Sequence, residues 1–260
     1  MKEEILKELT LLEQKLNIKI LYAVESGSRA WGFESINSDW DVRFIYVHNI
    51  DWYLSIEDKK DNYEKILSND IDLSGWELRK TLQLFRKSNP PLLEWLNSPI
   101  VYIEKYNTVK KLKVLSANYF NPKACMYHYL NIAENNYKTY MLVDPVRTKK
   151  YFYALRPLLA CFWIEKYNTI PPMEFEILLN NRLPEADILK NEILQLLSRK
   201  RNGEELASGP RIDLINDFIE KGIACFKRYL NDFDISINSD SSMLDELFRE
   251  TLLETGSVLE

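Results

Sequence analysis

Two aspartates separated by a single residue, Asp39 and Asp41, stand at the start of an apolar run in the sequence. Side chains alternate between the two faces of a strand, so we expect the two carboxylates to point the same way. Like charges this close repel each other, and a divalent cation such as Mg²⁺ relieves the repulsion while also binding phosphate oxygens. Arg43 follows by one further alternation, where it can contact phosphate or neutralise Asp41. Taken alone, an Asp-x-Asp pair is more typical of a solvated strand face.

A glycine turn upstream of the aspartates, Ser26-Gly27-Ser28-Arg29, changes that interpretation. Glycine lets the backbone approach a ligand closely, and the hydroxyls of Ser26 and Ser28 can donate hydrogen bonds to phosphate oxygens. Arg29 can neutralise phosphate charge. Without the aspartates, the glycine would be typical of an ordinary strand-to-helix turn. Together the two motifs predict a triphosphate site that faces a metal site.

The elements around these motifs indicate an α/β domain. Strands are expected at 18–24 and 40–47, which are rich in β-branched and aromatic residues, and a third is expected near 70–75. Helical spacing of apolar residues indicates helices at 2–16 and from about 77 to 86. The glycine turn therefore ends one strand and the aspartates open the next.

Helical periodicity replaces the strand signals beyond residue 98. The helical stretches expected there are 119–140, 149–165, 172–179, 186–197, 211–229 and 243–253. We therefore predict an α/β (α+β) domain over residues 1–110 and an all-helical domain over residues 111–260.

Composition limits the location and the partners of the protein. The net charge of -5 argues against a wholly basic surface, so contact with nucleic acid would depend on a local patch. Three cysteines without a CxxC spacing favour free thiols in the reducing cytoplasm. The sequence contains no run of about 18 consecutive apolar residues, so we expect no membrane span, and no signal peptide is visible. His48 and His128 lack the neighbouring ligands of a zinc site.

The glycine turn, a short helix and the pair Asp39-x-Asp41 resemble the signature of the DNA polymerase β nucleotidyltransferase superfamily. The fuller strings GSRAWGFESINSDWDVRFIY and DLSGWELRKTLQLFRKSNPPLLEWLNSPIVY closely resemble the RlaP/YcgL family of nucleotidyltransferases, named for a proposed association with RNA ligases in RNA repair. The string KKYFYALRPLLACFWI resembles the C-terminal half of that family. The resemblance implies a nucleotidyltransferase-fold catalytic domain followed by a helical domain that binds nucleotide or acceptor.

The resemblance also implies a third carboxylate on a neighbouring strand. Asp72, in Ile71-Asp72-Leu73, has the matching apolar neighbours. Glu77 is the competing candidate, although its position at the start of a helix is explained by the helix macrodipole. By this resemblance Asp39, Asp41 and Asp72 form the catalytic and metal-binding set for Mg²⁺ or Mn²⁺, with Asp72 near the attacking hydroxyl.

A basic and aromatic stripe is expected on the helix that starts near residue 149. The stripe comprises Lys149, Lys150, Tyr153 and Arg156, because positions 150, 153 and 156 lie along one side of that helix. In the superfamily that it resembles, a helical domain often closes the nucleotide cleft, so we predict that the stripe binds the nucleotide. The alternative is an ordinary solvated surface.

The resemblance implies an enzyme that transfers a nucleoside monophosphate from an NTP to an acceptor hydroxyl, such as an RNA 3′ end. A second hypothesis keeps the chemistry but makes a protein hydroxyl the acceptor, as in toxin–antitoxin nucleotidyltransferases, and the acidic net charge favours it slightly. A third hypothesis is a non-catalytic nucleotide-binding regulator, which the intact motif residues make less attractive.

Overall fold

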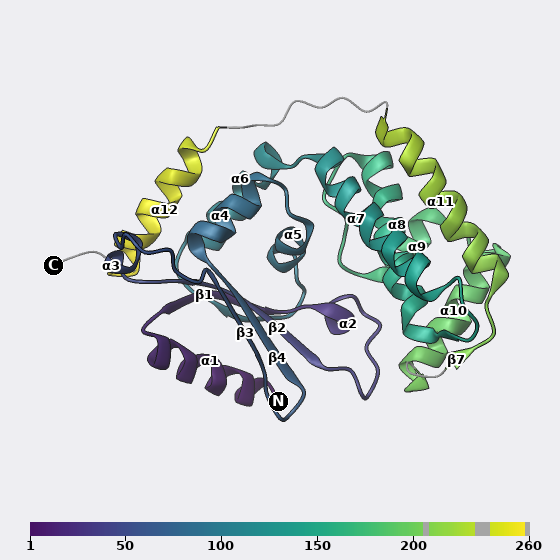
Figure 1. Ribbon diagram of the computed structural model, residues 1–260, viewed down its shortest axis with the longest axis horizontal. Coiled ribbons are helices and arrows are strands. Elements are labelled where there is room, and N and C mark those ends of the chain that lie inside the picture. The colour runs from purple at the N-terminus through teal and green to yellow at the C-terminus, as the bar shows by residue number, and fades with distance from the viewer. Residues whose placement is uncertain (205–207, 232–239, 258–260) are drawn as a thin grey trace. The chain divides into compact units, whose positions relative to one another are not determined.

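The computed structural model describes residues 1–204, 208–231 and 240–257 of the chain (Figure 1). The chain forms two compact units, which we call unit 1 and unit 2. Unit 1 contains Met1–Ala30, Asp39–Phe120 and the C-terminal helix, whereas unit 2 contains Trp31–Ser38 and the helices that follow Asn121. The predicted division used a single boundary at residue 110, but the units interleave along the chain because segments distant in sequence pack together.

Unit 1 contains a five-stranded sheet with the strand order β3-β4-β2-β1-β5. The strands are β1 (Lys19–Glu25), β2 (Trp40–Val47), β3 (Asn62–Ile66), β4 (Ile71–Glu77) and β5 (Val101–Glu104). Only the pair of β2 and β4 is parallel; the other neighbours in the sheet run antiparallel. The ends of β2 and β4 that carry Asp41 and Asp72 therefore coincide.

One face of this sheet packs on the first helix, α1 (Lys2–Leu16) (Figure 1). Ile5 and Leu9 of α1 are fully buried in a core with Val42 and Phe44 of β2. Because side chains alternate along a strand, Asp41 and Arg43 of β2 belong to the opposite face. Burial of the apolar face thus decides which face of the sheet carries the charged residues.

Short helices and the C-terminal helix complete unit 1. They are α2 (Gly27–Ala30), α3 (Ile50–Tyr53), α4 (Leu78–Arg86), α5 (Pro90–Leu96), α6 (Thr108–Tyr119) and α12 (Ser242–Glu254). Trp95 of α5 stacks on Trp76 of β4 with ring centroids 3.9 Å apart. Helix α5 therefore covers part of the sheet face opposite α1.

Unit 2 is dominated by helices, with a short two-stranded pair. Its elements are α7 (Pro122–Tyr140), β6 (Val146–Arg147), α8 (Thr148–Tyr167), α9 (Phe175–Arg182), α10 (Ile188–Arg201), β7 (Ser208–Gly209) and α11 (Asp213–Asn231). Phe33 from the segment Trp31–Ser38 is buried against Phe152 and Phe175. Lys200 donates a hydrogen bond of 2.8 Å to the Phe33 carbonyl. Part of the segment between the glycine turn and the aspartates therefore packs within the helical unit.

The predicted α/β class is confirmed, and β2 has the bounds expected from the sequence. The strands β3 and β5 and the helix α6 were not predicted. β3 and β5 lie at the edges of the five-stranded sheet, where the alternating burial that marks an inner strand is weak. Among the described residues, no helix combines the length and apolar character needed to cross a membrane.

Candidate active site

Asp41 and Asp72 are direct neighbours across the parallel strands β2 and β4. Arg43 joins them, since its Nη2 lies 2.8 Å from Oδ1 of Asp41 and 2.9 Å from Oδ2 of Asp72. Its Nη1 also donates to the Asp72 carbonyl at 2.9 Å. Arg43 therefore neutralises both carboxylates and takes one oxygen from each, which is one of the two roles predicted for it.

Gly27 lies against the Asp41 carboxylate at the start of α2. Its φ of 58° falls in the left-handed region, where glycine carries no steric penalty. A Cβ at this position would lie 2.0 Å from Oδ2 of Asp41. The backbone amide of Ser26 donates to the Asp41 carbonyl at 2.9 Å. The structure thus brings the two sequence motifs into direct contact, and the contact requires glycine.

The Asp41 carboxyl lies in an environment that disfavours its charge. Burial is the main reason that its pKa is raised, and the nearby carboxylates of Asp72 and Asp39 raise it further. Arg43 opposes this shift through its positive charge and its hydrogen bond. A group of like charges that a single arginine compensates only in part would gain from a cation.

Asp39 has a different setting from Asp41. It lies in the loop before β2 and is exposed, so strict strand alternation does not place it. Nε of Arg29 donates to the Asp39 carbonyl at 3.2 Å, and the Arg29 guanidinium lies 3.7 Å from the centroid of the Trp40 ring. Arg29 thus ties α2 to the start of β2.

The donor set suits a hard divalent cation, because carboxylate oxygens are the ligands that Mg²⁺ and Mn²⁺ prefer. Within residues 1–204, 208–231 and 240–257, however, no group of three His, Cys, Asp or Glu side chains is arranged to hold an ion. The oxygens of Asp41 and Asp72 that Arg43 does not take would be the first available to a metal. The assignment of Asp39, Asp41 and Asp72 as metal ligands stays a prediction.

Glu77 occupies the other end of β4. It is buried, and its Oε2 accepts hydrogen bonds from the backbone amides of Arg79 at 2.7 Å and Lys80 at 3.3 Å. The Tyr53 hydroxyl donates to its other oxygen. Glu77 pairs in register with Tyr46, five residues along β4 from Asp72. It is the N-cap of α4, so the geometry favours Asp72 over Glu77 as the third carboxylate.

Sequence reasoning overlooked Glu25, the residue immediately before the glycine turn. Glu25 is fully buried, and its oxygens accept hydrogen bonds from the Asp41 amide at 2.8 Å and from the Tyr102 hydroxyl at 2.5 Å. Burial raises its pKa to about 7, while these hydrogen bonds oppose the shift. An acidic residue at the end of the apolar run at residues 20–24 was the available signal.

The remaining predicted site residues lie on two different units. Ser26 and the buried Ser28 flank Gly27 in unit 1. Lys149, Lys150 and Tyr153 lie on α8 in unit 2. The Lys150 ammonium lies 3.6 Å from the ring centroid of Tyr140 and 5.8 Å from that of Tyr153. Arg156, the last residue of the predicted stripe, is instead buried, and its Nε donates to the Met173 carbonyl at 3.3 Å. The role of Lys149, Lys150 and Tyr153 in nucleotide binding stays a prediction.

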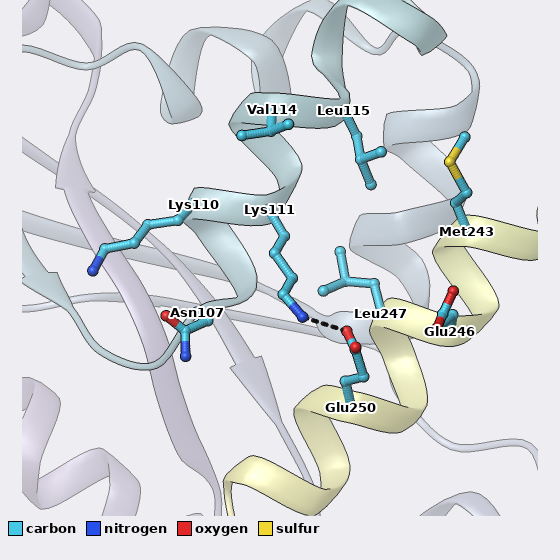
Figure 2. A pocket seen from close by; sticks show the side chains of 9 residues that line it. All are labelled: Asn107, Lys110, Lys111, Val114, Leu115, Met243, Glu246, Leu247 and Glu250. Carbon is cyan, nitrogen blue, oxygen red and sulfur yellow. Dashed lines mark hydrogen bonds and ion pairs between the residues drawn. The ribbon is translucent and has the colours of Figure 1, made fainter.

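Two hollows on unit 1 differ in their relation to the aspartates. One, of about 440 Å³, is lined by Arg43, Asp72 and Ser74 together with Glu64, Lys65 and Ile66 of β3. The other, of about 430 Å³, lies between α6 and α12, where Lys111 pairs with Glu250 at 2.6 Å over apolar side chains (Figure 2). None of the predicted site residues lines the second hollow, so the first is the one that belongs to the candidate site.

This chain is similar to known proteins in three comparisons. A model of the RNA repair pathway DNA polymerase beta family, RlaP, matches residues 1–250. The protein named "Uncharacterized protein YcgL" from Bacillus subtilis (strain 168) is 51% identical over 254 residues, which cover 98% of this chain and 97% of that protein. A nucleotidyltransferase-like protein from Exiguobacterium sibiricum 255-15, solved by crystallography, is 13% identical, with 92% of this chain and 83% of that chain covered and a TM-score of 0.29.

The structure combines a strand that ends in a glycine turn with two aspartates paired in register, and the family match gives the class of protein, a DNA polymerase β-type nucleotidyltransferase. The family match covers nearly the whole chain, and the chain belongs to the RNA repair pathway DNA polymerase beta family. The resemblance stated from the motifs is therefore confirmed.

Proposed function

We propose that this protein is a Mg²⁺- or Mn²⁺-dependent nucleotidyltransferase that transfers a nucleoside monophosphate from an NTP to an RNA 3′ hydroxyl. One observation carries the proposal. The backbone of Gly27 lies against the carboxylate of Asp41, which is itself paired in register with Asp72. This contact supports the proposal, because a glycine turn can bind phosphate and neighbouring carboxylates can hold the metal of a metal–triphosphate complex.

The reaction is an in-line displacement at the α-phosphorus. The acceptor oxygen forms a bond to the α-phosphorus, the bond between that phosphorus and the oxygen bridging to the β-phosphate breaks, and pyrophosphate leaves. Asp72 accepts the proton of the attacking hydroxyl. Its side chain is 35% exposed and borders the 440 Å³ hollow, so an acceptor can reach it from that side.

The other residues of unit 1 bind and orient the triphosphate. Asp39, Asp41 and Asp72 would hold the metal, which neutralises charge on the phosphates when it is bound. The hydroxyls of Ser26 and Ser28 donate to phosphate oxygens. Arg29 adds positive charge beside Asp39, and Arg43 keeps Asp41 and Asp72 close together.

The basic and aromatic residues of α8 bind nucleotide in this proposal. Lys149 and Lys150 of α8 provide positive charge for the phosphates, and Tyr153 offers an aromatic face for a base. The base that is transferred depends on the shape of this second set of contacts.

The acceptor has two candidates. The description of the family as part of an RNA repair pathway supports RNA. The net charge of -5 favours the second candidate, a protein hydroxyl, because an acidic protein does not attract polynucleotides through its overall field.

Cysteine usage supports a cytoplasmic location. Cys125 and Cys161 are buried and Cys225 is exposed, and none of the three forms a disulfide. An exposed free thiol persists best in a reducing compartment.

The test is nucleotide transfer by the purified full-length protein. It would be incubated with each α-³²P-labelled NTP, Mg²⁺ or Mn²⁺, and a mixture of RNA and proteins, and the products separated by nuclease and protease treatment. We expect label in RNA and release of pyrophosphate. Label in protein would move the acceptor to the second candidate, and label in neither would refute the enzymatic proposal.

The matched control uses two substitutions with the same loss of charge. Asp41→Asn should abolish labelling, whereas Asp58→Asn, at an exposed position of unit 1 outside the site, should not. Equal labelling by wild type and Asp41→Asn would show that the transfer does not use this site.

A further inference from the structure

Asp41 is held by its backbone as well as by its side chain. The β1–β2 ladder ends at the pair Glu25 and Val42, so the Asp41 amide lies beyond the last strand pair. The Glu25 side chain takes the place of a ladder partner, because its Oε1 accepts from that amide at 2.8 Å. Ser26 in turn donates its amide to the Asp41 carbonyl at 2.9 Å. Both backbone polar groups of Asp41 are thus bonded to the two residues that precede Gly27.

Both carboxylate oxygens of Glu25 and both of its backbone polar groups are hydrogen-bonded. Its second oxygen accepts from the Tyr102 hydroxyl at 2.5 Å. Its amide donates to the Ile100 carbonyl at 2.9 Å, and its carbonyl accepts from the Ser98 hydroxyl at 2.6 Å. A buried side chain whose two oxygens both accept hydrogen bonds, on a backbone that is itself bonded, holds the amide that it binds in one position before ligand binding.

A buried carboxylate lowers the stability of the fold unless hydrogen bonds and opposite charges compensate for its lost hydration. Removal of a carboxylate from water is unfavourable, and two hydrogen bonds and a nearby arginine offset this only in part. An apolar residue would be cheaper in a strand whose other residues from Ile20 to Val24 are buried and apolar. The one backbone group that the Glu25 carboxylate binds is the amide of Asp41, so the buried charge serves to hold that amide in position.

Resting on the function proposed above, we propose that Glu25 and Tyr102 are positioning residues of the active site. They touch neither substrate nor metal. Glu25 sets the backbone of Asp41 so that its carboxylate stays against Gly27, and Tyr102 holds Glu25 in the orientation that does this.

A matched pair of residues at the other end of the sheet supplies the control. Glu77 is also buried and also accepts from a tyrosine hydroxyl, that of Tyr53, and from backbone amides. Those amides belong to α4 and not to the candidate site. Equivalent substitutions at Glu25 and Glu77 therefore separate positioning of Asp41 from loss of a buried carboxylate in general.

The first experiment measures amide hydrogen exchange of Asp41 by NMR in the metal-free, full-length protein, relative to the amide of Ile45 on the same strand. Glu25→Leu should speed the exchange of Asp41 by at least about ten-fold relative to Ile45, because one hydrogen bond is lost. Glu25→Gln retains a carbonyl acceptor and should restore the ratio to within about three-fold. Glu77→Leu should leave the ratio unchanged. An unchanged ratio in Glu25→Leu, or an equal change in Glu77→Leu, would overturn the proposal.

The second experiment measures Mn²⁺ binding by electron paramagnetic resonance and transfer kinetics in the same variants. Glu25→Leu should weaken Mn²⁺ binding by about 10 to 100-fold, as for other residues that orient a metal ligand, and Glu25→Gln should recover most of it. Tyr102→Phe keeps the ring but removes the hydroxyl that holds Glu25, so it should reduce Mn²⁺ affinity by a smaller factor. This variant tests the proposal even if Glu25→Leu does not fold. Tyr53→Phe, which removes the hydroxyl that binds Glu77, is its control. Mn²⁺ binding unaffected by Glu25→Leu and Tyr102→Phe would refute a role in positioning the site.

The two proposals fail in different ways. If the wild-type protein transfers no nucleotide, the proposed function fails, and the exchange ratio still decides whether Glu25 positions Asp41. If transfer occurs but the exchange ratio and Mn²⁺ affinity do not depend on Glu25, the function stands and the positioning role is wrong.

Discussion

Glu25 and Glu77 are two buried glutamates at opposite ends of one sheet, and their local chemistry is nearly the same. Each ends a strand and accepts a hydrogen bond from one tyrosine hydroxyl; Glu25 also accepts from one backbone amide and Glu77 from two. They differ in the segment of the chain whose amide groups they bind. Glu25 binds the amide of Asp41, a candidate site residue, whereas Glu77 binds the first turn of α4 and caps a helix.

The difference shows that a buried carboxylate cannot be assigned a role from its own surroundings. Burial raises the pKa of both groups, and both have partners that offset it. Only the identity of the segment that each one holds separates a residue of the site from a residue of the scaffold. We therefore expect changes near Glu25 to affect transfer and changes near Glu77 to affect stability.

The largest effect is expected at the site end of the sheet. Asp41→Asn keeps the size of the side chain but removes the charge that a metal would bind, so transfer should fall by at least about 100-fold. The free energy of unfolding should change little, because Asp41 is 27% exposed and its bond with Arg43 is partly open to solvent. Steady-state transfer assays and urea denaturation measure the two quantities. A large loss of stability without loss of transfer would contradict the division between the two ends.

The reverse result is expected at Glu77. Glu77→Ala removes the cap of α4 and leaves the Tyr53 hydroxyl without its acceptor, so unfolding should become easier by about 2–4 kcal/mol. Transfer at a temperature where the variant is folded should remain near that of the wild type. Urea denaturation measures the first effect, with Glu57→Ala, at an exposed glutamate of unit 1, as the control. Loss of transfer in the folded variant would bring Glu77 back as a candidate carboxylate.

A smaller change in stability is expected at Gly27, together with a loss of function. Gly27→Ala forces an alanine to a φ of 58° and directs its Cβ at the Asp41 carboxylate. We expect a cost of about 1–2 kcal/mol from backbone strain, and transfer reduced by about ten-fold or more because Asp41 must move. Gly32→Ala is the control, since Gly32 has a φ of 77° but open space around a Cβ. It should show the strain without the loss of transfer.

The smallest effect concerns pH at the Glu77 end. Burial lowers the pKa of His48 to about 4, with a further contribution from Lys59. In the unfolded chain His48 takes up a proton near its ordinary pKa of about 6.5, whereas in the folded protein it stays neutral down to about pH 4. The neutral His48 therefore does not reduce the free energy of unfolding above pH 6.5, and that free energy falls as the pH drops from 6.5 towards 4. Between pH 7 and pH 5 we expect His48→Gln to lose about 1 kcal/mol less stability than the wild type, once solvent screening is allowed for. Urea denaturation at pH 7 and pH 5 measures this difference. If the wild type and His48→Gln lost the same free energy of unfolding between the two pH values, the pKa of His48 would not be lowered by burial.

Local patterns were sufficient for the elements that carry the site. The β-branched and aromatic residues of Trp40–Val47 predicted the bounds of β2, and the turn at Gly27 with the pair Asp39 and Asp41 predicted a phosphate site next to carboxylates. These features depend on neighbouring residues in the chain, so the sequence contains all the information that they need. The family resemblance extended the prediction to Asp72 on the next strand.

Tertiary structure decided the rest, because the contacts involved join residues that are far apart in the sequence. Pairing of β2 with β4 put Asp72 opposite Asp41 and left Glu77 to cap α4. The packing of Trp31–Ser38 in unit 2 is equally invisible in a local pattern. The same is true of the bond between Glu25 and the amide of Asp41, 16 residues apart, because a side chain can replace a ladder partner only after two strands have paired.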